Sequence, residues 1–160
     1  VNCKSSSKSS SSASCVMPSL ADMLDKTLFL ATMASAGLRS GRHKGVDIFG
    51  RPSQAVIAPS ECIVFFAGDL GRGGNSVACL GWKWRVHIFL HLSSIETYPG
   101  AMLDQGDTLG FVGDTGNAKG KPPHLHYEII TPIPLPWRMD DSTQGWKKAF
   151  HLDPTEELLR

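Results

Sequence analysis

The chain has 160 residues, of which 41% are apolar, and this is enough for one hydrophobic core in one domain with tails. Lysine and arginine number 16 against 15 aspartate and glutamate residues, so the bulk charge favours neither nucleic acid nor an anionic membrane as partner. No run of about 18 apolar residues is present, so the sequence predicts no membrane span.

The first part of the chain is nearly all serine between Lys4 and Ser14. This composition cannot bury enough apolar surface to offset the entropy of ordering, so residues 1–18 are predicted to form a flexible tether. A domain is expected over residues 19–160. It begins with Ser19 as a helix N-cap, Asp22 in the first turn, and apolar residues at helical spacing at Leu20, Met23, Leu24, Leu28 and Ala31. This pattern predicts one amphipathic helix over about residues 19–34.

Beyond residue 41 the sequence changes to short apolar runs separated by Gly, Pro, Asp or Asn, which is typical of a mainly β domain. The gaps between the runs are too short for repeated crossover helices, so an antiparallel sheet is favoured. The glycine-rich segment 68–74 is predicted to be a hairpin loop. The expected strands lie at 55–58, 62–67, 75–80, 86–92, 108–112 and 125–130.

The four cysteines, Cys3, Cys15, Cys62 and Cys79, lack the paired spacing of a structural zinc site. Disulfides, free thiols and lipidation therefore remain open for them. Cys62 and Cys79 lie on the two strands that flank the predicted 68–74 loop, so they are candidates for a disulfide across the hairpin. Such a bridge requires α-carbons about 4.4 to 6.8 Å apart.

Four of the six histidines lie where they could build a metal site. His43 and Asp47 are close together in the sequence, and His124 and His126 form an H-x-H pair on a predicted strand. Alternate strand residues point to one face, so both histidines of the pair can face one pocket. Zinc accepts imidazole nitrogen and carboxylate oxygen, and a catalytic zinc normally has three protein ligands with the fourth position open, a count that two histidines and one aspartate satisfy. The plain alternative is that these histidines are ordinary polar residues of a loop and a half-exposed strand. A further histidine, His91, lies among apolar residues and makes coincidence a weaker explanation.

Several segments together resemble the LytM and lysostaphin-type zinc metallopeptidases. These are 41–47 (GRHKGVD), 91–93 (HLS), 113–117 (GDTGN) and 123–128 (PHLHYE), and the resemblance covers about residues 39–131. By position, it implies that His43, Asp47 and His126 hold Zn²⁺. It likewise implies that His91 and His124 are the catalytic pair, which activate the attacking water and stabilise the tetrahedral intermediate.

Other residues depart from this pattern or lie near it. Phe89 stands where relatives often have tyrosine. Glu128 continues the alternation of the H-x-H strand and is either an orienting partner of a ligand or a solvated glutamate. His87 could share the strand face of His91, although a structural role is favoured, and no role is assigned to His151. The polar residues of the Gly-rich turns, Asn75, Asp114, Thr115 and Asn117, are assigned to turn formation.

The resemblance implies a small antiparallel β domain with an open groove for an extended peptide. The implied function is a zinc endopeptidase that cuts peptide cross-links of bacterial peptidoglycan, with a preference for bonds that follow D-alanine. This places the protein in the bacterial cell envelope, in the periplasm or secreted, with Cys3 as a candidate lipid attachment site. Two alternatives are a non-enzymatic wall-binding or amidase-activating domain and a structural zinc domain. The sequence leaves the oligomeric state open.

Overall fold

The computed structural model describes residues 45–143 and 145–155, and these residues form a mainly β, antiparallel structure, as predicted. The predicted tether, the predicted helix at 19–34 and His43 lie outside the described residues. None of the described helices is long and apolar enough to cross a membrane. The described strands are β1 (Val46–Phe49), β2 (Ala55–Ile57), β3 (Cys62–Asp69), β4 (Asn75–Gly81), β5 (Arg85–Ile95), β6 (Met102–Leu103), β7 (Thr108–Val112), β8 (His124–Ile130) and β9 (His151–Leu152).

Short 3-10 helices connect several of these strands. They are η1 (Gly71–Gly73), η2 (Trp82–Trp84), η3 (Gly116–Ala118), η4 (Pro136–Arg138) and η5 (Gly145–Ala149). The predicted hairpin loop at 68–74 is confirmed, because β3 and β4 pair on either side of η1. The four tryptophans lie in η2, η4 and η5 and are all more than half exposed, so none of them belongs to the core.

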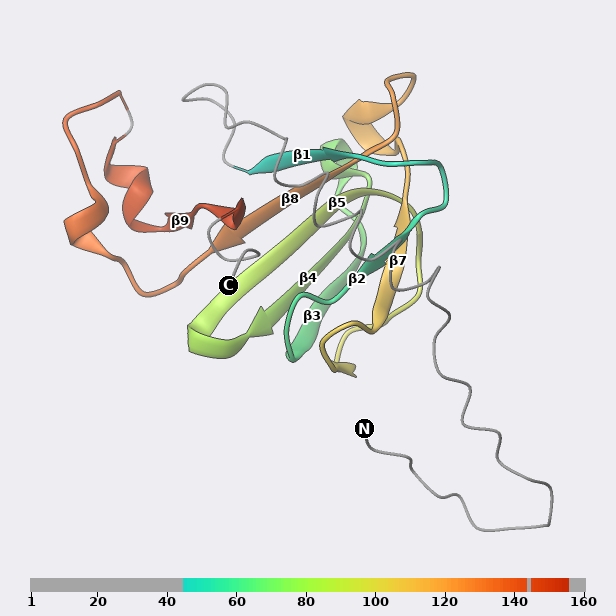
Figure 1. Ribbon diagram of the computed structural model, residues 1–160, viewed down its shortest axis with the longest axis horizontal. Helices are drawn as coiled ribbons and strands as arrows, with labels where there is room; N and C mark the ends of the chain where they lie inside the picture. Colours follow the sequence, from blue (N-terminus) through green and yellow to red (C-terminus); the bar gives the residue numbers. More distant parts are fainter. Residues whose placement is uncertain (1–44, 144, 156–160) are drawn as a thin grey trace, which may run out of the picture.

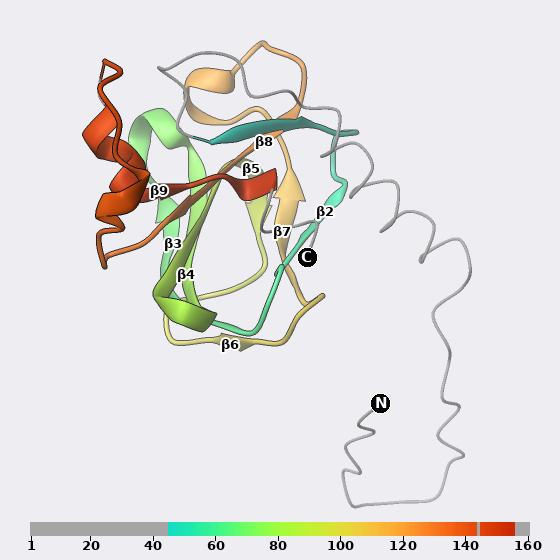
Figure 2. The same cartoon turned by 60° about the vertical axis from the view of Figure 1, so that its left-hand side comes forward.

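The sheet is continuous through the strand order β1-β8-β5-β4-β3-β6, with every pairing antiparallel (Figure 1 and Figure 2). The long strand β5 also pairs with β7, which in turn pairs with β2. Figure 2 shows β3 and β4 facing β2 and β7 across the interior, so the sheet curves around its core. Strand β8, which carries the H-x-H pair, lies between β1 and β5.

The core is formed by alternate residues of the strands, as expected for a sheet with one buried face. On β8 the inward side chains are Leu125, Tyr127 and Ile129, each at most 1% exposed. They pack in one cluster with residues of β1 to β5 and β7. The opposite face of β8 therefore carries His124, His126 and Glu128, and this alternation confirms that the two histidines share a face.

The predicted disulfide between Cys62 and Cys79 is wrong, since both cysteines are free in the structure. The two strands pair with Cys62 opposite Gly81 and Cys79 opposite Val64, so the cysteines are diagonal rather than direct neighbours. The thiols are nevertheless in contact. A hydrogen bond from Cys79 holds the pKa of Cys62 below its usual range, and the same contact, together with burial, raises the pKa of Cys79.

His87 is a buried structural histidine rather than a neighbour of His91. It is 2% exposed and faces the core, where its Nδ1 lies 2.7 Å from the hydroxyl oxygen of Tyr127 and the two rings stack. Burial, and then the positive charge of Arg85, lower the pKa of His87 from 6.5 to about 4. The folded protein therefore keeps this imidazole neutral at neutral pH.

This depressed pKa predicts an acid-sensitive fold. Below about pH 6.5 the unfolded chain protonates His87 more readily than the folded chain, and the difference grows until the pH reaches the folded pKa. We expect the free energy of unfolding to lose about 3 kcal/mol from this residue as the pH falls from 6.5 to 4. Denaturant titrations across this range, compared with His87→Asn, measure the contribution. An identical pH dependence in the two proteins would contradict it.

Candidate metal and catalytic site

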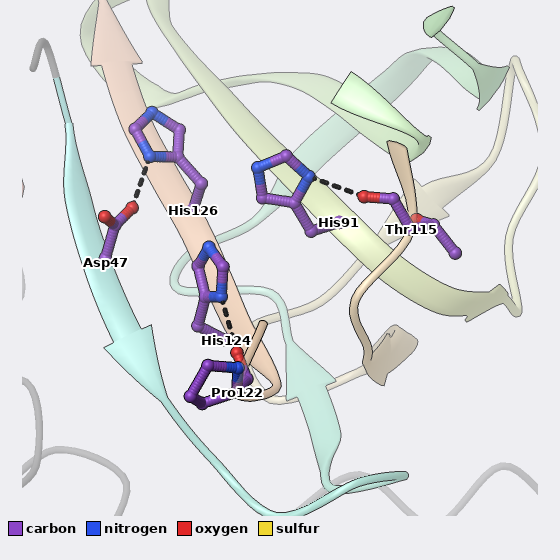
Figure 3. Close-up of polar contacts among 6 residues, drawn as sticks. All are labelled: Asp47, His91, Thr115, Pro122, His124 and His126. Carbon is purple, nitrogen blue, oxygen red and sulfur yellow. Dashed lines mark hydrogen bonds and ion pairs between the residues drawn. The ribbon is translucent and has the colours of Figure 1, made fainter. Parts of the chain in front are cut away.

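Strand pairing brings Asp47 and His126 together although they are 79 positions apart in the chain. Asp47 of β1 lies directly opposite His126 of β8, and both point away from the core. The Oδ1 atom of Asp47 lies 2.6 Å from Nδ1 of His126, and the two side chains are 33% and 13% exposed. Figure 3 shows this contact at the edge of a space that His91 and His124 also face.

Gly45 lets the chain that precedes β1 pass close to His126. A Cβ atom at this position would lie 2.6 Å from the carbonyl oxygen of Tyr127 and 2.8 Å from Nε2 of His126. Neither distance is compatible with a side chain unless its surroundings move. Gly45 is therefore required sterically: without a side chain, the backbone just before β1 can lie in contact with the His126 imidazole.

A β-bulge turns His91 toward the same space. Between Asn75 and Val77 strand β4 has one residue, Ser76, and opposite it β5 has two, Leu90 and His91. His91 has a backbone φ of 67°, a left-handed conformation that is uncommon for a residue with a side chain. In a regular strand His91 would follow Phe89 into the core, and the bulge instead moves it to the face of the H-x-H pair. His87 and His91 therefore lie on different faces of β5, although regular alternation would place them on one.

The three imidazoles of His91, His124 and His126 form one cluster. The ring centroid of His91 lies 5.2 Å from that of His124 and 6.2 Å from that of His126. His91 and His124 are only 7% and 8% exposed. The phenyl ring of Phe49, opposite His124 on β1, lies 5.5 Å from the His124 ring and closes one side of the cluster.

Backbone carbonyls determine which ring nitrogen of His91 and His124 carries the proton. Nδ1 of His91 lies 3.0 Å from the carbonyl oxygen of Thr115, and Nδ1 of His124 lies 2.8 Å from that of Pro122 (Figure 3). A carbonyl can only accept, so Nδ1 must donate in both rings. In the neutral form Nε2 is then an unprotonated base. Burial lowers the pKa of His91, an effect that the Thr115 carbonyl partly opposes, and this favours the neutral form.

The site residues expected from the sequence are thus largely brought together. Asp47, His91, His124 and His126 share one space, while His43 lies outside the described residues. Within residues 45–143 and 145–155 no group of three His, Cys, Asp or Glu side chains is arranged to hold a metal ion. The donor atoms of Asp47 and His126 are nonetheless a carboxylate oxygen and an imidazole nitrogen in close approach, a pair that suits zinc.

Glu128 is neither fully solvated nor paired with one of the site histidines in the contacts that the described residues show. Its Oε1 atom lies 2.6 Å from Nδ1 of His151 on β9, in an ion pair when that histidine is protonated. Sequence reasoning missed the roles of Thr115 and Pro122 as partners of the imidazoles. Both residues accept these hydrogen bonds through main-chain carbonyl oxygens. Every residue type has this group, so the sequence does not reveal the contact. The turn residues 113–117 and the paired prolines before the H-x-H strand were the available signals.

A curved antiparallel sheet that carries a carboxylate–imidazole pair beside two further imidazoles has the features of a metal-dependent hydrolase. A sequence model of peptidase family M23 matches residues 41–135, which is more than half of the chain. The chain belongs to this family. The resemblance to LytM and lysostaphin-type peptidases inferred from the sequence is confirmed.

Comparisons with individual proteins agree with this assignment. The chain is 31% identical over 114 residues, 68% of its length, to the DD-carboxypeptidase/endopeptidase Mpg of Neisseria meningitidis. It is 32% identical over 97 residues, 59% of its length, to the glycyl-glycine endopeptidase ALE-1 of Staphylococcus capitis. In both cases the match spans 26% of the relative's own length.

Among solved structures, the catalytic domain of the antimicrobial peptidase lysostaphin from Staphylococcus simulans is similar in fold. The superposition has a TM-score of 0.59 at 26% sequence identity and covers 78% of this chain and 84% of that domain. The antiparallel β architecture predicted from the sequence is therefore shared with a peptidase domain.

Proposed function

We propose that this chain is a zinc-dependent endopeptidase that hydrolyses peptide cross-links of bacterial peptidoglycan. The observation that carries the proposal is the approach of Asp47 and His126 to 2.6 Å beside two imidazoles whose Nδ1 atoms contact carbonyl oxygens, which makes Nε2 the basic nitrogen of each neutral ring. Family membership and the activities named for the relatives support the same reaction.

In this proposal His43, Asp47 and His126 hold Zn²⁺. Three protein ligands leave room for water or substrate, which is the usual composition of a catalytic rather than a structural zinc site. Bound zinc would supply Lewis acidity, which makes water more acidic and polarises a carbonyl oxygen. The side chains of Asp47 and His126 are partly buried, at 33% and 13% exposed, and remain partly open to solvent.

His91 and His124 carry the proton chemistry. One neutral imidazole accepts a proton at Nε2 from the attacking water, and its carbonyl partner at Nδ1 stabilises the charge that develops on the ring. The protonated imidazole can then donate to the leaving amide nitrogen. The second imidazole, with its centroid 5.2 Å away, is close enough to orient water or to stabilise the oxyanion once protonated.

We further propose that the bond cleaved follows D-alanine and that the protein acts in the bacterial cell envelope. The match to the DD-carboxypeptidase/endopeptidase Mpg extends over more of the chain than the match to the glycyl-glycine endopeptidase ALE-1. The proposed organisation is a tether at 1–18 followed by a peptidase domain at 19–160, which contains the family match at 41–135. An extended peptide groove across the zinc and the lipid anchor at Cys3 remain predictions.

Digestion of purified peptidoglycan tests the proposal. Zinc-loaded protein is incubated with one wall that is cross-linked through D-alanyl bonds and another with glycine bridges, and the products are identified by mass spectrometry. We expect cleavage after D-alanine in the first wall, loss of cleavage after chelation, and recovery on zinc addition. Cleavage of glycine bridges alone would overturn the bond assignment. No cleavage of either wall by zinc-loaded protein would favour a wall-binding or amidase-activating role.

A further inference from the structure

The hydroxyl of Thr115 bridges two strands beside the bulge that contains His91. It donates a hydrogen bond to the carbonyl oxygen of Leu92 at 2.8 Å and accepts one from the backbone N–H of Asn75 at 3.0 Å. Asn75 and Leu92 are direct partners in the pairing of β4 with β5. The hydroxyl therefore joins a donor and an acceptor of adjacent strands at the end of the bulge.

The main chain of the same residue contacts the site. The carbonyl oxygen of Thr115 accepts the hydrogen bond from Nδ1 of His91, so one residue is tied to both the imidazole and the strand that bears it. Figure 3 shows Thr115 on the side of His91 that is turned away from Asp47. Two hydrogen bonds therefore link Thr115 to consecutive residues of β5: one to the side chain of His91 and one to the carbonyl oxygen of Leu92.

Two glycines allow Thr115 to lie this close to β4. A Cβ atom on Gly74 would lie 2.3 Å from the Thr115 hydroxyl oxygen, and one on Gly116 would lie 2.4 Å from the backbone nitrogen of Gly74. Both glycines have left-handed φ values, 64° and 65°. The loops before β4 and after β7 are thus in direct main-chain contact, which leaves Thr115 little freedom to move.

We propose that Thr115 is the positioning residue for His91, an inference that rests on the proposed endopeptidase function. Its hydroxyl sets the position of its own carbonyl relative to β5, and that carbonyl holds the His91 ring with the proton on Nδ1 and the base on Nε2. His91 lies in the bulge with a left-handed backbone and has no Cα partner on β4. The hydrogen bond from its Nδ1 to the Thr115 carbonyl therefore sets the orientation of the ring. Within the part of the chain that the structure describes, the hydrogen bonds of Thr115 go to Asn75, His91 and Leu92, so its effect on the chemistry is exerted through His91.

Thr115→Val removes the hydroxyl with little change in shape, and Thr115→Ser retains it. In the peptidoglycan assay we expect Thr115→Val to lower kcat by about ten- to a hundredfold with KM within about twofold, the effect of a misplaced catalytic group. Thr115→Ser should restore kcat to within about threefold of the unchanged protein. Thr108→Val, the same change at an exposed position of β7, is the matched control and should have no effect. Zinc content should be equal in all four proteins.

The tautomer of His91 provides a readout that does not depend on activity. Nitrogen-15 NMR of the imidazole in metal-free protein should show the proton on Nδ1 in the unchanged protein and in Thr115→Ser, and a mixture of tautomers in Thr115→Val. A proton on Nε2 of His91 in the unchanged protein would overturn the proposal even if Thr115→Val failed to fold. So would an unaltered tautomer and kcat in Thr115→Val, or a serine variant as defective as the valine variant. If the unchanged protein cleaved no peptidoglycan, the tautomer measurements would still decide the positioning role.

Discussion

Alanine in place of Asp47 or His126 is expected to abolish zinc binding and peptidoglycan cleavage together. Each change removes one of the proposed donor atoms, which lie 2.6 Å apart. Two remaining protein ligands are too few for a stable zinc site, so metal content should fall far below one equivalent. His43→Ala should give the same result, because it removes the third proposed ligand. Elemental analysis of the purified variants, beside the cleavage assay, measures both effects.

Matched controls separate ligand loss from general damage. Asp141→Ala changes an exposed aspartate between η4 and η5, and His151→Ala changes a histidine that contacts Glu128. Both should keep stoichiometric zinc. Circular dichroism should show a native β signal in every variant, because the core cluster contains none of the proposed ligands. Full zinc content in Asp47→Ala or His126→Ala would refute the ligand assignment.

His91→Ala and His124→Ala should have the second largest effect, and it should be confined to turnover. Neither imidazole is needed for the three-ligand set, so zinc should remain near stoichiometric. Loss of a positioned acid or base lowers turnover by about two to four orders of magnitude. Zinc content and kcat measured on the same preparations distinguish these variants from the ligand variants.

The two histidines of the H-x-H strand provide an internal test. They lie on the same face of β8, and their Nδ1 atoms have different partners: a carboxylate for His126 and a backbone carbonyl for His124. If His124→Ala lost zinc while His126→Ala retained it, the roles of the two would have to be exchanged. Equal zinc loss in both variants would require His124 to be a ligand as well.

The strands were predictable where their apolar runs were long enough to show a pattern. All six predicted strands are present, because each alternates between buried and exposed positions or has a continuous apolar run. β6 and β9 were not predicted, since two residues cannot show a period. β1 was not predicted either. Its sequence begins within the GRHKGVD motif, and its strand conformation depends on pairing with β8.

The register of the β3–β4 hairpin could not be predicted from spacing alone. Counting from the loop suggested that Cys62 and Cys79 were opposite each other, but the hairpin closes with Asp69 opposite Asn75, a register that already separates the two cysteines. The register shift between Val64 and Phe66 changes the pairing by one residue and leaves Cys62 opposite Gly81. Both cysteines are buried, because their offset of two positions keeps them on the same face of the sheet.

The sequence by itself determined the residue types of the site and the family of the protein, because the motifs that contain Asp47, His91, His124 and His126 lie in a characteristic order. It also determined that His124 and His126 share a face, since strand alternation is a local property. Only the tertiary structure decided that Asp47 meets His126, because this contact depends on the pairing of β1 with β8. The direction of His91 was likewise decided by the bulge opposite Ser76, which reverses the alternation that the sequence predicts.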